Sequence, residues 1–345
     1  PEGRHRWLHG YQPDVKAIFQ RLFDRFLDYL EFPPDDMMGT VSTLSLWTML
    51  TYTYCAWSAV PYLSIGGPLG SGKSRTFEVL GLLVYNPMQS SNLTAPCLFR
   101  TLHMQGGTVL LDEAERLKDR TPDAGEMRSI LLAGYRRGGQ ASRLEKSGED
   151  FTPTSFDVYG PKALAAISNL PSALASRCIR IMMFRAGRDS PVPKRRIDPT
   201  AKIWRELRDD LHSMALTYGA TFVKMTNWLP GCGDLNGRAL ELWQPILALA
   251  KFVEDAGMPG LVETVEAHAA RSIASASDEV VPEEDEVLLQ LLKQQLLDKP
   301  WGVTPSEVLE VAKNEEPALF SRYSPRGISA VLGRYGSTIS RSGGK

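Results

Sequence analysis

A glycine-rich stretch in the first quarter of the chain has the residue types of a phosphate-binding loop. Gly67 is followed, after four residues, by Gly72, Lys73 and Ser74, between an apolar run and an amphipathic run. Glycines let backbone N–H groups turn inward toward phosphates, and a following helix adds its positive end. Lys73 would supply a point charge for the β- and γ-phosphates, and the Ser74 hydroxyl a ligand for Mg²⁺. The residues expected to contact the nucleotide are Gly67, Gly70, Ser71, Gly72, Lys73, Ser74 and Arg75. The alternative is a glycine-rich turn that fits the pattern by chance.

A pair of acids further along the chain completes this chemistry. The apolar run Thr108 to Leu111 ends in Asp112 and Glu113. A buried strand of this kind delivers both acids to the edge of the sheet where the phosphate loop begins. We expect Asp112 to hold Mg²⁺, directly or through water, and Glu113 to act as general base on the attacking water. An isolated Asp-Glu pair is often a surface strand end, but its place after the phosphate loop favours an ATPase site.

The composition excludes several other classes of protein. Lys and Arg number 39 and Asp and Glu 40, so there is no global attraction to nucleic acid or membrane. The four cysteines form no Cys-x-x-Cys pair, which favours a reducing compartment, the cytoplasm, over a zinc site. The stretch Val41 to Val60 is long enough to raise the question of a membrane span. Its Ser, Thr, Tyr and Trp residues favour a helix buried against the sheet instead, and no membrane partner is expected.

The elements around the loop alternate between strands and helices, which predicts an α/β fold with a parallel sheet flanked by helices. A hairpin is expected at residues 140–159, with its tip at Ser147 and Gly148. The other expected elements are helices at 13–31, 41–58, 75–84 and 124–135, strands at 60–65, 108–111, 162–169 and 178–184, and a short helical turn at 170–177.

This order of elements resembles an AAA+ ATPase, and the hairpin resembles that of superfamily 3 and minichromosome-maintenance helicases. The layout is also similar to a family of phage, plasmid and integrative-element ATPases of unassigned function that are often joined to primase modules. The matching stretches are Ser91-Asn92, Cys97-Leu98-Phe99-Arg100, Leu110 to Ala114, Arg136-Arg137-Gly138, Tyr159 to Ala163 and Leu174 to Cys178. The resemblance spans roughly residues 15–340.

The resemblance implies further catalytic residues. Asn169 matches the sensor 1 position of AAA+ proteins in general, although the mobile-element family does not keep Asn there. Arg177 matches the finger that enters a neighbour's active site, where a planar guanidinium neutralises charge on the γ-phosphate. The competitors for that role are Arg136, Arg137 and Arg180. Arg238 matches sensor 2, which touches the γ-phosphate of its own or a neighbouring site; the alternative is a solvated arginine at a helix start.

Two regions are candidates for contact with DNA. In related helicases the hairpin projects into a central pore, and Arg143 and Lys146 occupy that segment here. Acidic neighbours at 145, 149 and 150 leave a plain surface hairpin open as the alternative. Three helices from residue 283 onward, and a stretch from 322 to 345 in which every charged residue is basic, predict a winged helix-turn-helix that binds DNA through Arg326 and Arg334. A small protein-contact domain with a solvated tail is the alternative there.

Together these features predict an N-terminal helical collar at 1–58, an AAA+ P-loop core at 59–188, a helical lid at 200–276 and a winged-helix-like domain at 283–341. The expected activity is Mg²⁺-dependent ATP hydrolysis in a ring, a hexamer, that moves single-stranded DNA through its pore during replication of a mobile element. A primase or polymerase module is an expected partner. Two alternatives stay open: a helicase loader or protein remodeller, and a DNA-binding initiator in which ATP controls assembly only.

Overall fold

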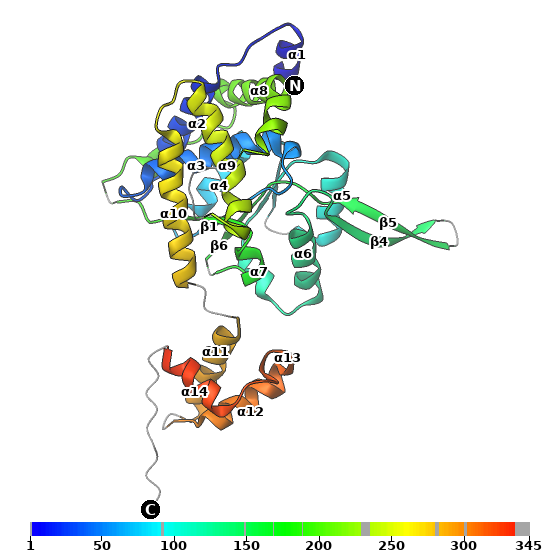
Figure 1. Cartoon of the computed structure of the whole chain (residues 1–345), viewed down its shortest axis with the longest axis vertical. Coiled ribbons are helices and arrows are strands. Elements are labelled where there is room, and N and C mark those ends of the chain that lie inside the picture. The colour runs from blue at the N-terminus through cyan, green and yellow to red at the C-terminus, as the bar shows by residue number, and fades with distance from the viewer. Residues whose placement is uncertain are drawn as a thin grey trace, which may run out of the picture. The chain divides into compact units, whose positions relative to one another are not determined.

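The computed structural model describes residues 2–90, 93–147, 150–167, 169–187, 189–228, 235–279, 283–299 and 302–334. The chain divides into two compact units, Pro1–Ser275 and Ala276–Lys345. The first unit contains the sheet, the hairpin and the helices up to α10 (Leu261–Glu279), whose last turn crosses the boundary (Figure 1). The described part of the second unit contains four further helices.

A five-stranded sheet forms the centre of the first unit. Its order is β2-β3-β6-β1-β7, and every neighbouring pair is parallel. The strands are β1 (Tyr62–Gly66), β2 (Pro87–Ser90), β3 (Thr108–Leu111), β6 (Lys162–Ala166) and β7 (Cys178–Met182). The predicted α/β fold with a parallel sheet flanked by helices is therefore confirmed. The edge strand β2 was not predicted, because it is short and its first residue is Pro87.

Side chains alternate between the two faces of the sheet and so enter two cores. Leu63 and Ile65 enter the core shared with α2, α3, α4, α8 and α9, whereas Leu164 and Cys178 enter the core shared with α5, α6 and α7. The second set of helices is α5 (Ala95–Gln105), α6 (Pro122–Ala133) and α7 (Ser172–Ala175). Helices on both faces explain why β1, β3, β6 and β7 are mainly apolar.

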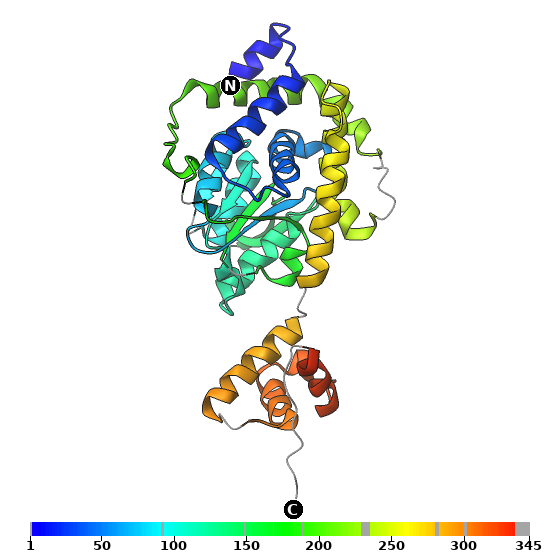
Figure 2. The same cartoon turned by 90° about the vertical axis from the view of Figure 1, so that its left-hand side faces the viewer.

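The helices of the expected collar and lid pack together in one layer. Helix α8 contacts α1, α2 and α3, and α9 contacts α2 and α3. Figure 2 shows α10, in yellow, beside these helices, and it joins their core through Leu261 and Val265. The bounds are α1 (Glu2–Leu8), α2 (Val15–Tyr29), α3 (Met37–Thr53), α4 (Lys73–Leu83), α8 (Lys202–Met225) and α9 (Gly237–Asp255).

Helix α3 is the buried helix that the sequence predicted. Every residue from Gly39 to Thr53 is buried, and the hydroxyls of Ser45 and Thr48 donate to carbonyls one turn back, both at 2.8 Å. The helix starts and ends a few residues earlier than expected, and a 3₁₀ turn at Tyr54–Ala56 follows it. Within the described ranges, no helix combines the length and the apolar character needed to span a membrane.

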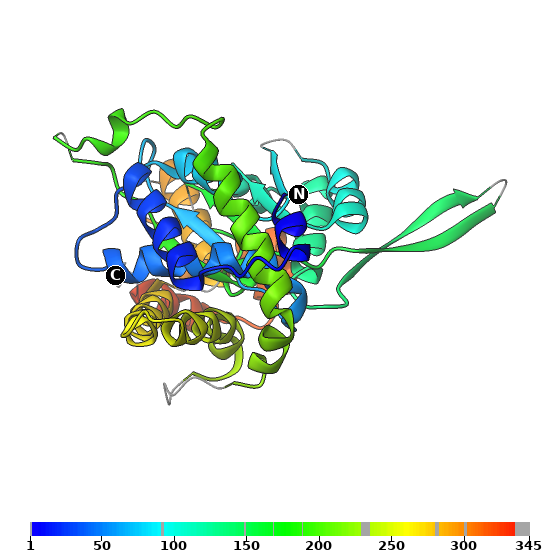
Figure 3. The ribbon, with the colours of Figure 1, turned by 90° about the horizontal axis from the view of Figure 1, so that it is seen from above.

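The hairpin formed by β4 (Gln140–Ser147) and β5 (Asp150–Asp157) extends away from the rest of the first unit (Figures 1 and 3). Its base contacts α5 and α6. Of the predicted tip, Gly148 lies outside the described residues, whereas Ser147 is the last residue of β4.

The second unit is a small helical domain. It consists of α11 (Glu283–Asp298), α12 (Pro305–Glu315), α13 (Pro317–Phe320) and α14 (Pro325–Arg334), packed around residues such as Leu288, Val308 and Ile328. Thr304 and Glu307 form a capping box at the start of α12. The hydrogen bond and charge of Lys299 and the bonds from Thr304 lower the pKa of Glu307 to about 2. The predicted wing, at residues 335–341, lies outside the described residues.

Candidate functional site

The carboxyl ends of β1, β3 and β6 meet at one edge of the sheet because the three strands are parallel neighbours. The phosphate loop follows β1, Asp112 and Glu113 follow β3, and Asn169 lies three residues beyond the end of β6. The fold thus brings together three groups that are far apart in the sequence.

The phosphate loop has the backbone that its glycines permit. Gly67, Gly70 and Gly72 have φ angles of 145°, 77° and 95°, which favour glycine. A Cβ atom on Gly67 would lie 2.3 Å from the carbonyl oxygen of Met183. Gly72 is the N-cap of α4, so the free N–H groups of that helix point toward the loop. Only glycine fits at Gly67, and the loop is shaped as an anion-binding turn.

Lys73 lies inside the loop. Its Nζ donates to the carbonyl oxygens of Gly67 at 2.6 Å and Pro68 at 3.0 Å. The loop therefore holds the ammonium group by two of its own carbonyls, in the position from which it can reach a phosphate.

Ser74 and Asp112 form the second contact of the site. The Ser74 hydroxyl lies 3.4 Å from Oδ2 of Asp112, and Oδ1 accepts the backbone N–H of Glu113 at 2.9 Å. A hydroxyl and a carboxylate at this distance are the oxygen ligands that Mg²⁺ prefers. In addition, the hydroxyl of Ser71 is buried and has no hydrogen-bond partner among the described residues. The donor set fits Mg²⁺ and a phosphate ligand.

Glu113 has a strained backbone. Its φ is 55°, and Asn86 is the one other non-glycine residue with a positive φ in the described part of the chain. Such left-handed residues are costly and concentrate at functional sites. The carboxylate of Glu113 pairs with Arg116 at 2.5 Å and is 47% exposed. A general-base role therefore requires this ion pair to open.

The remaining predicted contacts at this edge differ in their geometry. Asn169 is exposed, and its sensor role stays a prediction. The Arg75 guanidinium donates to carbonyls of Tyr29 at 2.8 Å, Val192 at 3.3 Å and Arg195, so it points away from the loop and only its backbone N–H is left for the nucleotide. Arg185, which sequence reasoning missed, donates from Nε to the loop carbonyl of Leu69 at 2.9 Å.

Arg177 and Arg238 lie at the opposite edge of the sheet. The carbonyl of Arg177 accepts from the N–H of Tyr62, the first residue of β1, and that of Tyr135 accepts from Val60. From Tyr62 to Gly66 the strand rises roughly 13 Å, at about 3.3 Å per residue. Arg177 and Arg238 both lie against the ring of Tyr135. The sensor role of Arg238 and the finger role of Arg177 stay predictions.

The competing arginines are held differently. Arg136 pairs with Glu241, and Arg137 donates to the carbonyl of Cys55. Arg180 lies on β7, where burial lowers the pKa of its guanidinium. Neither Tyr135 nor Glu241 was singled out in the sequence.

The hairpin does not present Arg143 and Lys146 as one basic patch. These residues are three apart on one strand, so their side chains project from opposite faces. Nε of Arg143 donates to Glu126 of α6 at 3.0 Å, and its guanidinium lies over the ring of Phe99. Arg143 thus ties the hairpin to the body of the unit, and its role in DNA binding stays a prediction.

The outer face of the hairpin carries Lys146 with three apolar residues. The register pairs Lys146 with Phe151 and Leu144 with Pro153, and directly opposed residues share a face. Leu144 and Phe151 are 69% and 66% exposed. We call Leu144, Lys146, Phe151 and Pro153 the outer hairpin face. Sequence reasoning could have found it from the period of two.

In the second unit, Arg326 is exposed in the first turn of α14. Arg334 is the last residue of that helix, and its side chain lies outside the described part. Their DNA-binding role stays a prediction.

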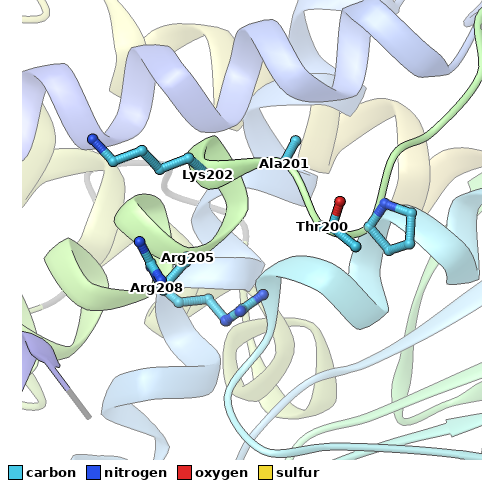
Figure 4. A pocket seen from close by; sticks show the side chains of 6 residues that line it. Thr200, Ala201, Lys202, Arg205 and Arg208 are labelled. Atoms are coloured by element: carbon cyan, nitrogen blue, oxygen red, sulfur yellow. The ribbon is translucent and has the colours of Figure 1, made fainter.

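A basic hollow of about 220 Å³ lies at the start of α8, away from the phosphate loop (Figure 4). It is lined by Pro199, Thr200, Ala201, Lys202, Arg205 and Arg208. Arg208 donates to the carbonyl of Leu82 at 2.7 Å, and Lys202 pairs with Glu206 at 2.8 Å. Two of its three cations therefore already have protein partners.

Neither a protein-family model nor a curated protein matches this sequence. Among solved structures, the active helicase Cch of SCCmec type IV aligns with a TM-score of 0.43 and 12% identity over 81% of this chain. This chain spans 55% of the length of that protein. The JCV helicase aligns with a TM-score of 0.29 and 14% identity over 79% of this chain and 76% of its own. At these TM-scores and identities the alignments carry no argument about function.

Proposed function

We propose that this chain is an AAA+ ATPase that hydrolyses ATP with Mg²⁺. The observation that carries the proposal is the contact between Ser74 and Asp112, at 3.4 Å, beside a phosphate loop that encloses Lys73. A serine that follows the loop lysine and an acid at the end of another strand of the same sheet, here β3, are the two protein ligands of a P-loop magnesium site.

Each residue at this edge has a defined task. The loop amides and Lys73 bind the β- and γ-phosphates, and Ser74 and Asp112 hold Mg²⁺, which when bound neutralises charge on the phosphate oxygens. Glu113 accepts a proton from the attacking water once its pair with Arg116 opens. Asn169 orients that water. Arg185, next to the outer carbonyl of the loop, adds a cation on the solvent side.

The opposite edge supplies the trans-acting groups in our proposal. Arg177 and Arg238 lie about a strand length from their own loop, so they complete the site of an adjacent subunit in a ring, which we propose to be a hexamer. A γ-phosphate that loses its bond spreads charge over three oxygens, and guanidinium groups neutralise it.

The outer hairpin face is the proposed contact with single-stranded DNA. Phe151 offers a ring on which a base can stack, and Lys146 offers a cation for a phosphate, which together bind without regard to sequence. The same face favours one second candidate, a protein remodeller or helicase loader, because Leu144, Phe151 and Pro153 also suit an apolar protein partner.

Steady-state ATP hydrolysis with and without single-stranded DNA tests the proposal. We expect Lys73→Ala to abolish turnover, and DNA to stimulate the wild type. We expect the double variant Lys146→Ala, Phe151→Ala to lose stimulation but keep basal turnover. Thr152→Ala, on the opposite hairpin face, is the control. Unstimulated hydrolysis would favour the remodeller, and a wild type without ATPase activity would refute the proposal.

A further inference from the structure

Three guanidinium groups meet around one tyrosine and one glutamate at the amino-terminal edge of the sheet. Arg136 and Arg238 both pair with Glu241, one carboxylate oxygen each. The ring centroid of Tyr135 lies 5.0 Å from the guanidinium of Arg238 and 5.7 Å from that of Arg177. We call these five residues the arginine cluster. They come from the turn after α6, from α9 and from the residue before β7, so folding alone brings them together.

The tyrosine ring is a rigid support. Tyr135 is 1% exposed and packs edge-on against Tyr62, with centroids 5.7 Å apart and planes at 84°. Tyr62 is itself fully buried and donates its hydroxyl to the carbonyl of Leu131 at 2.8 Å. A ring anchored in this way offers its face to cations at a fixed position.

The glutamate compensates the charge of two arginines. Like charges at short range repel, and Glu241 lies between Arg136 and Arg238. One carboxylate against three guanidinium groups still leaves the cluster positive. The side chains of Arg136 and Arg238 are 61% and 36% exposed, so this charge faces outward. A surplus of preset cations at an accessible edge suits a polyphosphate better than a single carboxylate.

We propose that Glu241 and Tyr135 are positioning residues that preset Arg136, Arg177 and Arg238 as one group for the triphosphate bound by a neighbouring subunit. This inference rests on the proposed function, because it requires a shared site. Arg136 thereby joins Arg177 as a partner rather than a competitor. Presetting matters because a displacement of about 1 Å in a catalytic group can cost a factor of about 100 in rate.

Glu241→Gln and Tyr135→Leu in the full chain test the inference, with folding checked by circular dichroism. We expect each to lower kcat at least tenfold, with KM and the affinity for a fluorescent ATP analogue within twofold of wild type. Tyr135→Phe, which keeps the ring, should retain most of the rate. Glu263→Gln, an exposed acid in the first turn of α10, is the matched control and should behave as wild type.

A subunit-mixing assay separates positioning from a general structural effect. Lys73→Ala subunits have an intact arginine cluster, and Glu241→Gln subunits have an intact phosphate loop. Mixing the two should restore activity, because some interfaces combine the intact halves. A subunit with a damaged fold would not recover in this way.

Two results would overturn the inference while leaving the proposed function intact. One is wild-type kcat for both Glu241→Gln and Tyr135→Leu in an enzyme that Lys73→Ala inactivates. The other is a kcat above wild type for Glu241→Gln, which would make Glu241 an inhibitory latch. If the wild type hydrolyses no ATP, the proposed function fails first.

Discussion

Lys162 provides a test of the core in which both the direction and the size of the change in folding stability follow from the structure. Its side chain is fully buried, and Nζ donates to the carbonyls of Gly160 at 2.9 Å, Val158 at 3.0 Å and Gly134 at 3.3 Å. It also lies 4.9 Å from the centroid of the Tyr62 ring. The amine therefore joins the end of α6 and the exit of the hairpin to β6.

Burial lowers the pKa of Lys162 from 10.5 to about 7. Between these values the unfolded chain binds a proton that the folded protein has released, so stability rises with pH across this window. The slope for one proton is about 1.4 kcal/mol per pH unit. Lys162→Met removes this pH dependence. Between pH 8 and 9.5 the stability of the wild type relative to the variant should therefore rise by about 1.4 kcal/mol for each pH unit.

Two opposed effects set the stability of the variant at pH 7.5. The folded wild type releases the proton about three units below the ordinary pKa, which costs it about 4 kcal/mol, and Lys162→Met does not have this cost. Gly134 keeps a second donor, the N–H of Gly160 at 3.3 Å, but no other donor to the carbonyls of Val158 and Gly160 is seen among the described residues. At about 1 kcal/mol for each orphaned carbonyl, the substitution loses about 2 kcal/mol. Lys162→Met should therefore be about 2 kcal/mol more stable than the wild type at pH 7.5, and the two proteins should be about equally stable near pH 9.

Urea denaturation followed by tryptophan fluorescence measures both effects, because six of the seven tryptophans lie in the first unit. Lys224→Met, an exposed lysine near the end of α8, is the control and should show the wild-type slope. If the free energy of unfolding changes with pH by the same slope in wild type and Lys162→Met, the carbonyls hold the proton on Lys162 up to its ordinary pKa. That result would refute the reasoning.

Three further predictions concern the loop, the metal ligand and the second unit. Gly67→Ala should weaken binding of a fluorescent ATP analogue at least tenfold, because its Cβ would lie 2.3 Å from the Met183 carbonyl oxygen. Gly219→Ala, whose Cβ would have nothing within 4 Å, is the control and should bind as wild type. Equal affinities of the two variants would contradict the loop geometry. Asp112→Asn should raise the Mg²⁺ concentration needed for half-maximal ATPase activity by about tenfold, and an unchanged midpoint would remove Asp112 from the metal site. Thr304→Ala should destabilise α12 by about 1 kcal/mol, seen as about fivefold faster amide hydrogen exchange in that helix, and unchanged exchange would show that the capping box contributes nothing.

The carboxyl edge of the sheet could be predicted because its signals are local. Apolar runs marked β1, β3, β6 and β7, and the glycines marked the loop between β1 and α4. Because the strands are parallel, their carboxyl ends lie at the same edge of the sheet. The contact between Ser74 and Asp112 therefore follows from the order of the elements along the chain.

The arginine cluster could not be predicted in the same way. The contact of Arg136 with Glu241 joins residues 105 positions apart, and nothing near either residue indicates the other. The hairpin is an intermediate case. Its strands and the two cations on them were expected, whereas the face on which each cation lies was not predicted, although a spacing of three on a strand places Arg143 and Lys146 on opposite faces.

The two ends of the strands lie about a strand length apart. This distance separates an arginine that acts in its own subunit's site from an arginine that acts in a neighbouring subunit's site. Arg185 touches its own loop at Leu69, whereas Arg177 lies about a strand length away. An Arg185→Ala subunit therefore carries its defect in the same site as Lys73, so mixing it with Lys73→Ala leaves every interface with a damaged loop and no recovery. An Arg177→Ala subunit keeps its loop intact, and the same mixture recovers. Recovery of both variants would show that Arg185 also acts in trans, so the strand length would not separate the two sets of residues. Recovery of neither would remove Arg177 from the neighbouring site, and the shared site would have to be abandoned.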